Sequence, residues 1–380
     1  MSIRKRSLPG IHTDEIAKAR LPLPSGYTLP RAAYTSKEIY ALECEHILRK
    51  SWLPIARIDQ VPEHGSYLTL DLLGQPVMVV HGADDEIRVM SSVCLHRGAP
   101  IAQGSGKRNV FTCPYHAWSY DTTGQLRRAP LMEGAEDFTE NAHRLPQIRS
   151  EVWEGFILAN LDPDAQPLAP QIAAFTDYFK NFQMGDMFVA KTLTFDSGWN
   201  WKVLVENFME AYHHIAIHST TFEPVFHARD SRVPDNTGPW SILHMPAAFE
   251  EMPPGSATIA GLEDWQAKDL FASVIFPHFM LGIHGQGAAW YQVIPAAANH
   301  LTLKIHLMMP KSAAEHADFE SMVAEMAESV SAIHQEDIEA NDLVWVGLNA
   351  PMTEQGRLSP LEKSIWQLNQ WWLDKMLGHD

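Results

Sequence analysis

Two cysteines and two histidines in the first third of the chain have the types and the spacing of a metal site. Cys94 and His96 are separated by one residue, and after sixteen intervening residues Cys113 and His116 are separated by two. Thiolates and imidazoles in such mixed pairs can bind a two-iron cluster, with the cysteines on one iron and the histidines on the other. Zinc is the alternative metal, but zinc sites usually pair Cys with Cys and His with His. The spacing therefore favours an iron–sulfur cluster.

The residues around these pairs are typical of tight loops, as Gly98 and Pro114 show. The strings Cys94-Leu-His-Arg-Gly-Ala and Cys113-Pro-Tyr-His-Ala-Trp-Ser-Tyr resemble the cluster-binding loops of Rieske proteins, specifically those of the oxygenase branch. The resemblance implies that the two cysteines and two histidines hold a [2Fe–2S] cluster. Ala117 stands where the family more usually has glycine, a change small enough to keep this assignment.

A second histidine-rich stretch reads Glu210-Ala-Tyr212-His213-His214-Ile-Ala-Ile-His218. Two imidazoles and one carboxylate that leave coordination positions open suit ferrous iron and oxygen chemistry. On a regular helix, at about 100° per residue, His214 and His218 lie one above the other, which is at least as favourable as His213 and His218. The residues alone therefore leave the ligand pair open.

This stretch resembles the catalytic helix of Rieske non-haem iron oxygenases, in which an acid, two intervening residues and a His are followed by four intervening residues and a second His. The resemblance implies that His213 and His218 bind a mononuclear Fe(II), with His214 beside the site or at the surface. It also implies that Glu210 bridges two metal sites through the imidazoles and is not itself a ligand. Many ring-dihydroxylating members have Asp at the position of Glu210, whereas Glu is more familiar among demethylating and monooxygenating relatives.

The third iron ligand of the family is an aspartate late in the chain, on a helix that follows the last strands. By this resemblance we expect Asp337 to be the third metal ligand, with Glu336 and Asp342 as competitors. Asn200 and Tyr212 are further candidates for the catalytic site, in a supporting role next to the ligands.

Composition limits the classes of function. At 380 residues and 46% hydrophobic content, the chain is long enough for two domains with buried cores. A formal net charge of −17 argues against a nucleic-acid partner, which needs a basic face. Three cysteines favour a reducing compartment over a disulfide framework. We see no secretory signal and no run of eighteen apolar residues, and therefore expect a cytoplasmic protein without a membrane span.

The expected fold class is α+β. It combines a small antiparallel β Rieske domain with a larger catalytic domain, in which helices cover an antiparallel sheet in a helix-grip-like arrangement. We expect an N-terminal arm and helix over 1–45, the Rieske domain over 46–162 and the catalytic domain over 163–380. Prolines at 163, 167 and 170 support the second boundary.

Local patterns predict the individual elements. Prolines over 7–31 indicate an extended arm along a surface, and Pro-rich residues 226–262 indicate irregular loops over a pocket entrance. Apolar periodicity predicts strands at 67–72, 76–81, 86–93, 152–161, 191–195, 272–283, 288–294 and 301–308. Helices are expected over 36–52, 199–217 and 319–333, and again near the C-terminus.

The resemblance implies a terminal oxygenase that uses O2 and electrons from NAD(P)H. A separate reductase or ferredoxin would deliver the electrons, because no Gly-rich dinucleotide fingerprint follows a strand in this chain. It also implies a homotrimer, in which electrons pass from His116 of one subunit through Glu210 of the next to His213. The N-terminal arm is a candidate for that interface.

The expected substrate is a small aromatic or other hydrophobic molecule, hydroxylated in aromatic-compound catabolism. Oxidative N- or O-demethylation is the alternative, and monooxygenation and dioxygenation both remain open. The expected pocket walls are the 226–262 loops and the residues Phe208, Met209, Phe276, Phe279, Leu281 and His284.

A Rieske electron carrier without oxygen chemistry is a remote alternative, and a lipid-like binding protein is more remote still. An electron carrier would need neither Glu210 nor the two histidines after it. Iron analysis separates the classes, since an oxygenase holds three irons and two acid-labile sulfides per chain and a carrier holds two irons.

Overall fold

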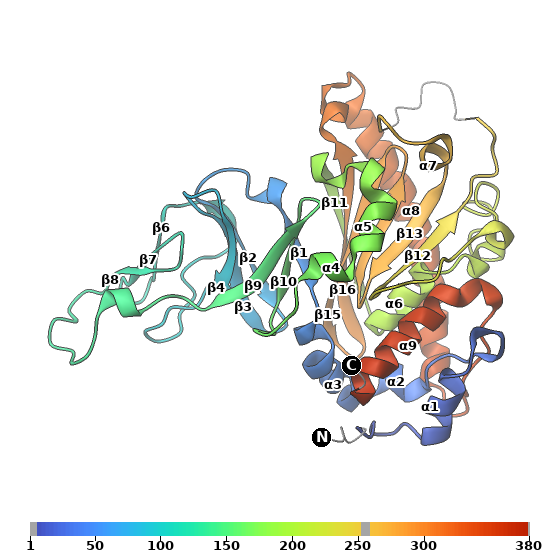
Figure 1. Cartoon of the computed structure of the whole chain (residues 1–380), viewed down its shortest axis with the longest axis horizontal. Coiled ribbons are helices and arrows are strands. Elements are labelled where there is room, and N and C mark those ends of the chain that lie inside the picture. Colours follow the sequence, from blue (N-terminus) through green and yellow to red (C-terminus); the bar gives the residue numbers. More distant parts are fainter. Residues whose placement is uncertain (1–5, 252–258, 379–380) are drawn as a thin grey trace. The chain divides into compact units, whose positions relative to one another are not determined.

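The computed structural model describes residues 6–251 and 259–378, which form two compact units (Figure 1). The small unit is Arg49–Pro167, and the large unit contains the residues before Arg49 and those from Leu168 onward. These divisions lie within five residues of the domain boundaries expected after 45 and 162. The N-terminal segment, expected as an element of its own, belongs to the large unit.

The small unit is built from antiparallel strands, as predicted. A three-stranded sheet has the order β6 (Val110–Thr112), β7 (Ser119–Asp121), β8 (Leu126–Arg128). The larger sheet has the order β1 (Leu53–Arg57), β10 (Phe156–Asn160), β9 (Gln147–Trp153), β4 (Ile87–Ser91), β3 (Gln75–His81), β2 (Ser66–Leu72), β5 (Ser105–Lys107).

The hairpin of β2 and β3 shows how the local sequence specifies this sheet. Tyr67 lies opposite Val80, and both side chains are buried, so the pairing register matches the apolar alternation. The connecting residues Leu73 and Gly74 both have positive φ, at 53° and 82°. Two such residues form the turn that suits the right-handed twist of a two-residue hairpin.

The large unit contains a six-stranded antiparallel sheet covered by helices, as predicted. The strand order is β11 (Met187–Ser197), β16 (His300–Pro310), β15 (Gly287–Ala297), β14 (Phe279–His284), β13 (Leu270–Ile275), β12 (Trp240–Met245). The helices that follow the small unit in the chain are α4 (Leu168–Gln171), α5 (Ala173–Phe179), α6 (Trp201–Phe208), α7 (Asp264–Lys268), α8 (Phe319–Asn349) and α9 (Lys363–Leu377).

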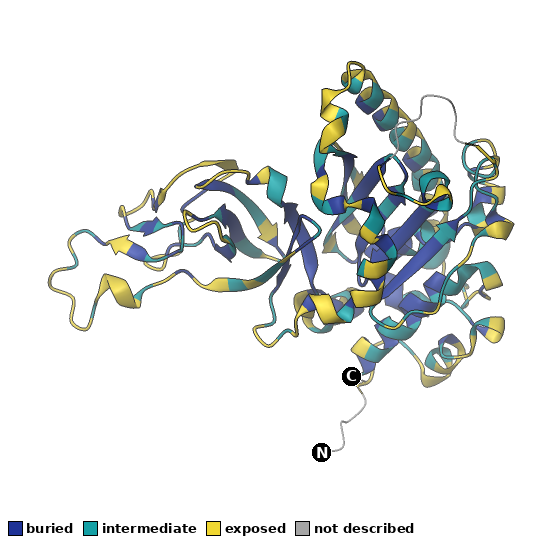
Figure 2. Ribbon diagram, turned by 45° about the horizontal axis from the view of Figure 1, so that its top comes forward, coloured by how far each residue is buried: buried dark blue, intermediate teal, exposed yellow. Residues whose placement is uncertain are grey.

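The long helix α8 lies against β11, β16 and α6, and α9 lies against β12. Figure 2 shows buried residues along the strands of this sheet and exposed residues on the outer turns of the helices. Among the described residues, no helix has both the length and the apolar composition needed to cross a membrane.

The N-terminal segment packs along the C-terminal helix of the same unit. It forms α1 (Thr13–Ala19), α2 (Arg31–Thr35) and α3 (Lys37–His46), so the arm expected over 7–31 is partly helical. Arg20 forms an ion pair of 2.6 Å with Asp374, and the Trp366 indole donates to the carbonyl of Leu21. The prolines lie outside α1, which explains how a Pro-rich segment accommodates a helix.

Three predicted elements of the large unit were wrong in extent. The helix expected over 199–217 ends at Phe208 and is followed by a 3₁₀ turn at Tyr212–Ile215. The strand expected over 272–283 is two strands, β13 and β14, joined by a turn at residues 276–278. The stretch expected to be irregular over 226–262 contains strand β12, while its part at 252–258 lies outside the described residues.

Candidate metal centres and substrate cavity

The two cysteine loops of the small unit are built alike. In each loop the N–H of the cysteine donates to the carbonyl five residues later, at 2.9 Å for Cys94 and 2.8 Å for Cys113. In each, the residue four positions after the cysteine donates its N–H back to the cysteine carbonyl at 3.1 Å. That residue has a left-handed backbone in both loops, with φ of 77° at Gly98 and 59° at Ala117. The loop geometry thus explains why glycine is usual at position 117.

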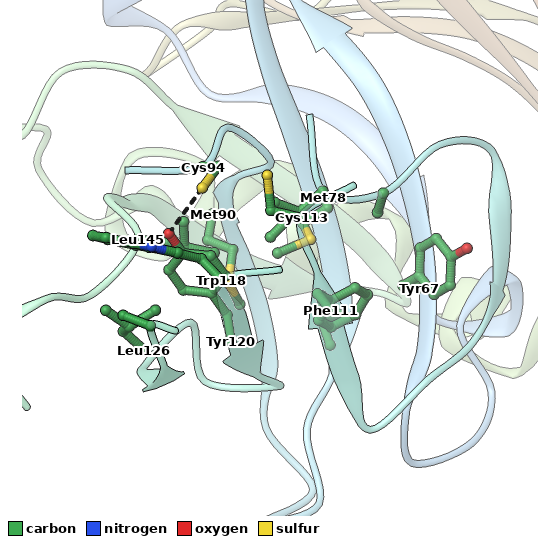
Figure 3. Packing of buried hydrophobic residues seen from close by; sticks show 14 residues of the cluster. Tyr67, Met78, Met90, Cys94, Phe111, Cys113, Trp118, Tyr120, Leu126 and Leu145 are labelled. Carbon is green, nitrogen blue, oxygen red and sulfur yellow. Dashed lines mark hydrogen bonds between the residues drawn. The ribbon is translucent and has the colours of Figure 1, made fainter. Parts of the chain in front are cut away.

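The hydroxyl of Tyr120 contacts the first cysteine loop. Its hydroxyl accepts from the N–H of Leu95 at 3.0 Å and lies 3.3 Å from Cys94 Sγ (Figure 3). Because the hydroxyl already accepts from Leu95, its own proton is available to the sulfur. Burial raises the pKa of Cys94, and the Tyr120 hydrogen bond opposes that rise by favouring the thiolate.

The donor set fits a cluster with one buried and one exposed metal. Cys94 and Cys113 are buried in one apolar cluster, whereas His96 and His116 are exposed. The two imidazole rings have centroids 4.6 Å apart, and His96 stacks on the buried Trp118. The two cysteines and two histidines would therefore hold a [2Fe–2S] cluster with its histidine-bound iron at the protein surface.

The break after α6 gathers the second set of candidate ligands. One ligand atom from each of His213, His218 and Asp337 lies within 4.8 Å of the other two. Asp337 Oδ1 is 3.0 Å from His218 Nε2 and 3.6 Å from His213 Nε2. Two imidazoles and one carboxylate that converge in this way would hold a ferrous ion and leave positions open for oxygen chemistry.

A carboxylate holds the far nitrogen of each of these histidines. Glu210 Oε1 lies 2.5 Å from His213 Nδ1, and Glu336 Oε2 lies 2.6 Å from His218 Nδ1. Thr221 donates its hydroxyl to the same oxygen of Glu336 at 2.8 Å. A carboxylate on Nδ1 turns Nε2 of the ring towards the metal position. Both histidines are therefore oriented for binding a metal through Nε2.

The third histidine of the motif has a different environment. His214 is buried, and its Nδ1 lies 3.4 Å from the carbonyl of Phe226. Burial, together with the nearby His213 and His218, lowers the pKa of His214 to about 3. The stacking of His214 and His218 expected on a regular helix does not apply here, because α6 ends at Phe208 and a 3₁₀ turn follows.

A cavity of about 660 Å³ opens beside these candidate ligands, within the large unit. Side chains of α8 form part of its wall, so the apolar stripe of that helix faces the cavity. Away from the ligands, its charged lining residues are Glu325 and Lys268. The aromatic side chains in the wall are Phe208, Phe222, Phe226, Phe249, Phe271 and Tyr291.

One of these rings contacts a candidate iron ligand, and two others contact each other. The ring of Phe222 has its centroid 5.2 Å from that of His218, and Phe208 and Tyr291 have centroids 4.7 Å apart. Burial raises the pKa of Tyr291, and the charge of Asp337 raises it further. The metal end of the cavity is thus aromatic and rich in carboxylates.

The match to known families agrees with this geometry. Residues 184–378 match the model of the ring hydroxylating alpha subunit (catalytic domain), which is half of the chain. Residues 51–144 match the Rieske [2Fe–2S] domain. The chain belongs to the Rieske ring-hydroxylating oxygenase alpha subunits.

Two curated relatives of this Rieske oxygenase alpha subunit differ in how much of the chain they match. The carnitine monooxygenase oxygenase subunit of Acinetobacter baumannii is 32% identical over 195 residues, 49% of this chain. The match spans about half the length of that relative, 51%. The glycine betaine monooxygenase oxygenase subunit of Pseudomonas aeruginosa is 24% identical over 388 residues, covering 93% of this chain and 90% of the relative.

Solved structures share the fold across the whole alpha subunit. The quaternary ammonium Rieske monooxygenase CntA in complex with an inhibitor gives a TM-score of 0.82 at 22% identity, covering 97% of this chain and 100% of that one. Naphthalene 1,2-dioxygenase from Rhodococcus gives 0.76 at 18% identity, covering 93% and 95%. At these identities the likeness shows the fold alone.

Several residues expected at the catalytic site of this alpha subunit lie elsewhere. Asn200 is buried and caps α6, accepting from the Lys202 N–H and donating to the Ala298 carbonyl. Tyr212 is about half exposed, at 47%, and is outside the cavity lining. Asp342 accepts from the Trp199 indole at 3.1 Å and is not among the gathered ligands.

Some of the residues expected to form the pocket wall line the cavity, and others do not. Phe208 and His284 line it, and the 226–262 segment contributes Phe226, Leu243, Met245 and Phe249. The other residues expected there are buried but belong to the packing of the unit rather than to the cavity lining: Met209, Phe276, Phe279 and Leu281.

Two supporting residues escaped sequence reasoning. The sequence indicates Glu336 only as a rival metal ligand, whereas its Oε2 lies 2.6 Å from His218 Nδ1. Tyr120 lies in the cluster-binding sequence, and no local pattern indicates its contact with Cys94. A signal existed for Glu336, since metal-bound histidines usually donate their second nitrogen to a carboxylate or carbonyl.

Proposed function

We propose that this protein is the terminal oxygenase of a Rieske monooxygenase that oxidises a carbon attached to the nitrogen of a quaternary ammonium or related amine substrate. The observation that carries the proposal is the aromatic lining of the cavity that holds the candidate ligands, with Phe222 next to His218 and the contacting pair Phe208 and Tyr291 in the same wall. Aromatic faces attract ammonium groups, and quaternary ammonium recognition is a common use of such cages.

Charge at this end of the cavity also favours a cation. Glu210, Glu336 and Asp337 carry three negative charges around the candidate metal position. A bound ferrous ion would neutralise two of them, which leaves one net negative charge around the metal position. The relatives named above act on carnitine, glycine betaine and quaternary ammonium compounds by their names, in line with this charge.

The opposite end of the cavity suits a polar tail. His284 Nδ1 accepts the N–H of Gln286, so the ring carries its proton on Nε2 and can donate. Burial lowers the pKa of His284 to about 4, which keeps the ring neutral. Gly287, paired with His284, is four residues before Tyr291 on β15, about 13 Å along the strand. His284 and Lys268 would bind a hydroxyl or carboxylate at that distance from the ammonium group.

The reaction proposed for this site is balanced by two electrons and two protons. One oxygen atom of O2 enters a C–H bond next to nitrogen, and the other leaves as water. The C–N bond of the hydroxylated product then breaks: nitrogen keeps the electron pair and leaves as an amine, the hydroxyl proton is released, and the carbon leaves as an aldehyde. Bound ferrous iron would supply the oxygen chemistry, while His213, His218 and Asp337 would hold it and the apolar walls would limit water.

We further propose that NAD(P)H electrons arrive through a separate ferredoxin or reductase in the cytoplasm and that the protein works as a homotrimer. The cluster of one subunit would then serve the iron of the next through His116, Glu210 and His213. Large apolar side chains are exposed near both centres, Leu95 and Tyr115 in the small unit and Tyr212 and Ile215 in the large unit. Exposed apolar side chains near a functional site favour a protein interface there.

Complementation tests the trimer. A chain with His116→Ala and a chain with Asp337→Ala, each inactive alone, would be co-expressed with different tags and co-purified. Recovery of turnover in the mixed oligomer is expected, because an intact cluster can then serve a neighbour's intact iron site. Mixed oligomers that stay inactive would contradict transfer between subunits.

The substrate class is tested with matched pairs of compounds. Purified oxygenase with a surrogate reductase would be offered trimethylammonium compounds and their uncharged tert-butyl analogues, and NADH oxidation and aldehyde release would be measured. Because a cation–π contact is worth about 1–2 kcal/mol, the ammonium member should have a roughly tenfold higher kcat/KM. Equal rates, or oxidation of the neutral member alone, would reject the ammonium proposal.

Hydroxylation of an uncharged aromatic substrate is the second candidate function. The mostly apolar wall of the cavity favours it, since such walls bind aromatic rings without a charge. In the same assay, stimulation by naphthalene-like compounds without aldehyde release would select this candidate.

A further inference from the structure

A second group of two histidines and one carboxylate lies in the small unit, away from the cluster loops in sequence. One ligand atom from each of His64, His81 and Asp85 lies within 4.8 Å of the other two. Asp85 Oδ1 is 2.6 Å from His64 Nε2 and 3.7 Å from His81 Nε2. The two imidazole rings meet edge to face, with centroids 5.2 Å apart.

The protonation of His81 is set by the backbone. Its Nδ1 lies 2.9 Å from the carbonyl oxygen of Val61, which can only accept a hydrogen bond. Nδ1 therefore carries the proton, and in the neutral ring Nε2 has a free electron pair facing Asp85. This is the arrangement that orients metal-binding histidines, with a carbonyl on one nitrogen and the metal on the other.

Backbone hydrogen bonds also fix the segments that carry the three side chains. His81 ends β3, and its carbonyl accepts from the N–H of Gly65, the residue after His64, at 2.8 Å. The turn that carries Asp85 is closed by a bond from the Gly82 N–H to the Glu86 carbonyl at 2.9 Å. Ligands on such fixed positions lose little conformational freedom on binding.

The nearby arginine pairs with Asp84, and Asp85 pairs with the two histidines. The adjacent Asp84 binds the Arg88 guanidinium through both oxygens, at 2.7 and 2.6 Å. Within the described residues, the ion-pair partners recorded for Asp85 are the two histidines. The turn thus has one carboxylate engaged by arginine and a second that faces two imidazoles.

We propose that His64, His81 and Asp85 form a second, solvent-accessible binding site for a divalent cation of the zinc class. Two imidazole nitrogens and one carboxylate oxygen suit Zn²⁺, Cu²⁺ or Ni²⁺ better than Mg²⁺ or Ca²⁺, which prefer oxygen ligands. Side chains of His64 and Asp85 are more than half exposed, so water can complete the coordination. The ion ties the loop before β2 to the β3–β4 turn and stabilises the small unit by binding its folded form.

The test uses the iron-loaded holoenzyme, so that iron occupies the catalytic ligands. Wild type, His64→Ala, Asp85→Asn and the control Glu86→Gln would be dialysed against buffered ZnCl₂, with zinc and iron per chain measured by mass spectrometry. Glu86→Gln removes one negative charge from the same turn and leaves the three ligands intact. The affected residues are exposed, so the variants are expected to fold, and the cluster spectrum confirms it.

Wild type and Glu86→Gln should each bind one zinc per chain beyond the iron and show a raised thermal midpoint in zinc. His64→Ala and Asp85→Asn should bind zinc at least about 10-fold more weakly, with iron content unchanged. The proposal would be overturned if Asp85→Asn bound zinc as tightly as the wild type, or if the wild type bound no zinc. The three residues would then form only an ion pair. Because the readout is zinc and not turnover, a wrong substrate class leaves this test intact.

Discussion

The two catalytic metal centres differ in how far apart in sequence their ligands lie. The cluster ligands come from two loops between Cys94 and His116, each closed by its own backbone hydrogen bonds. The candidate iron ligands come from the segment after α6 and from α8, and His218 and Asp337 are 119 residues apart. A centre built from local loops can be recognised from spacing, whereas one built from distant helices depends on how the unit folds around it.

The largest effect is expected when Asp337, the candidate iron ligand most distant in sequence, is removed. Asp337→Ala should lower the iron content from three to two per chain and reduce turnover by at least about 100-fold, because the metal loses a direct ligand. The visible spectrum of the cluster should be unchanged, since its ligands lie in the other unit. Metal analysis and coupled NADH oxidation measure both effects.

Asp342→Asn is the matched control for that change. It alters an aspartate of the same helix that binds the Trp199 indole and not the candidate ligands. Full iron content in Asp337→Ala, or loss of iron in Asp342→Asn, would contradict the assignment of Asp337.

Glu210 and Glu336, which bind the Nδ1 atoms of the two histidines, allow a second test of how the two metal centres differ. Glu336→Gln should weaken iron binding by about 10- to 100-fold, because His218 loses the group that fixes its Nδ1 proton. Glu210→Gln should leave the cluster spectrum intact and collapse coupled turnover even in enzyme that is fully loaded with iron. Iron titration and single-turnover reduction separate the two defects.

The control for both variants is Thr221→Val, which removes only one bond to Glu336 and should have the smaller effect on iron affinity. A contrary outcome would be that both Glu210→Gln and Glu336→Gln lose iron and that both regain turnover once iron is reloaded. In that case Glu210 only orients His213 and does not carry electrons between the two metal centres.

The large unit also contains a buried acid near its catalytic segment, which should make its stability depend on pH. Burial raises the pKa of Glu206 on α6 to about 7, and Tyr34 donates to its carboxylate. The folded state therefore holds a proton that the unfolded state releases above its ordinary value of 4.5. Stability is fully present below pH 4.5 and decreases by about 3 kcal/mol as pH rises through 7.

Thermal midpoints between pH 5 and 8 measure this decrease. Glu206→Gln keeps an acceptor for Tyr34 and should flatten the profile, whereas the exposed Glu328→Gln should leave it unchanged. A wild-type profile that rises over this range would show that Glu206 is ionised in the folded protein.

Within the small unit, the two cysteine loops can be compared with each other. Ala117→Gly should stabilise the second loop by about 1 kcal/mol, because a left-handed backbone costs a non-glycine residue roughly 1–2 kcal/mol. Gly98→Ala should destabilise the first loop by a similar amount, since a Cβ there meets only Val93 at 4.0 Å and the cost is conformational. Thermal unfolding followed by the cluster absorbance measures both changes. Equal melting midpoints for the wild type and both variants would contradict the idea that the two loops need the same left-handed residue.

The smallest expected effect is electronic. Tyr120→Phe removes the hydroxyl near Cys94 Sγ and should lower the cluster potential by on the order of tens of millivolts, because hydrogen bonds to sulfur raise it. Spectroelectrochemical titration measures the shift. Tyr115→Phe alters an exposed ring beside His116 and provides the control.

Sequence alone determined the ligands expected for the cluster and the two-part fold, because local spacing and strand alternation carry that information. It also placed Asp337 near the end of the chain, although only through resemblance. The structure brings Asp337 within 3.0 Å of His218, which no local pattern contains.

What only the tertiary structure showed is why the residues alone left His213 and His214 open, and that Glu336 binds His218. Helical periodicity assumes a continuous helix, but α6 ends at Phe208, and the 3₁₀ turn after it directs His213 towards Asp337. Asn200 likewise reads as a site residue until its amide is seen to cap α6. The contacts of His218 with Glu336 and Asp337 join segments more than a hundred residues apart, and neither propensity nor spacing encodes them.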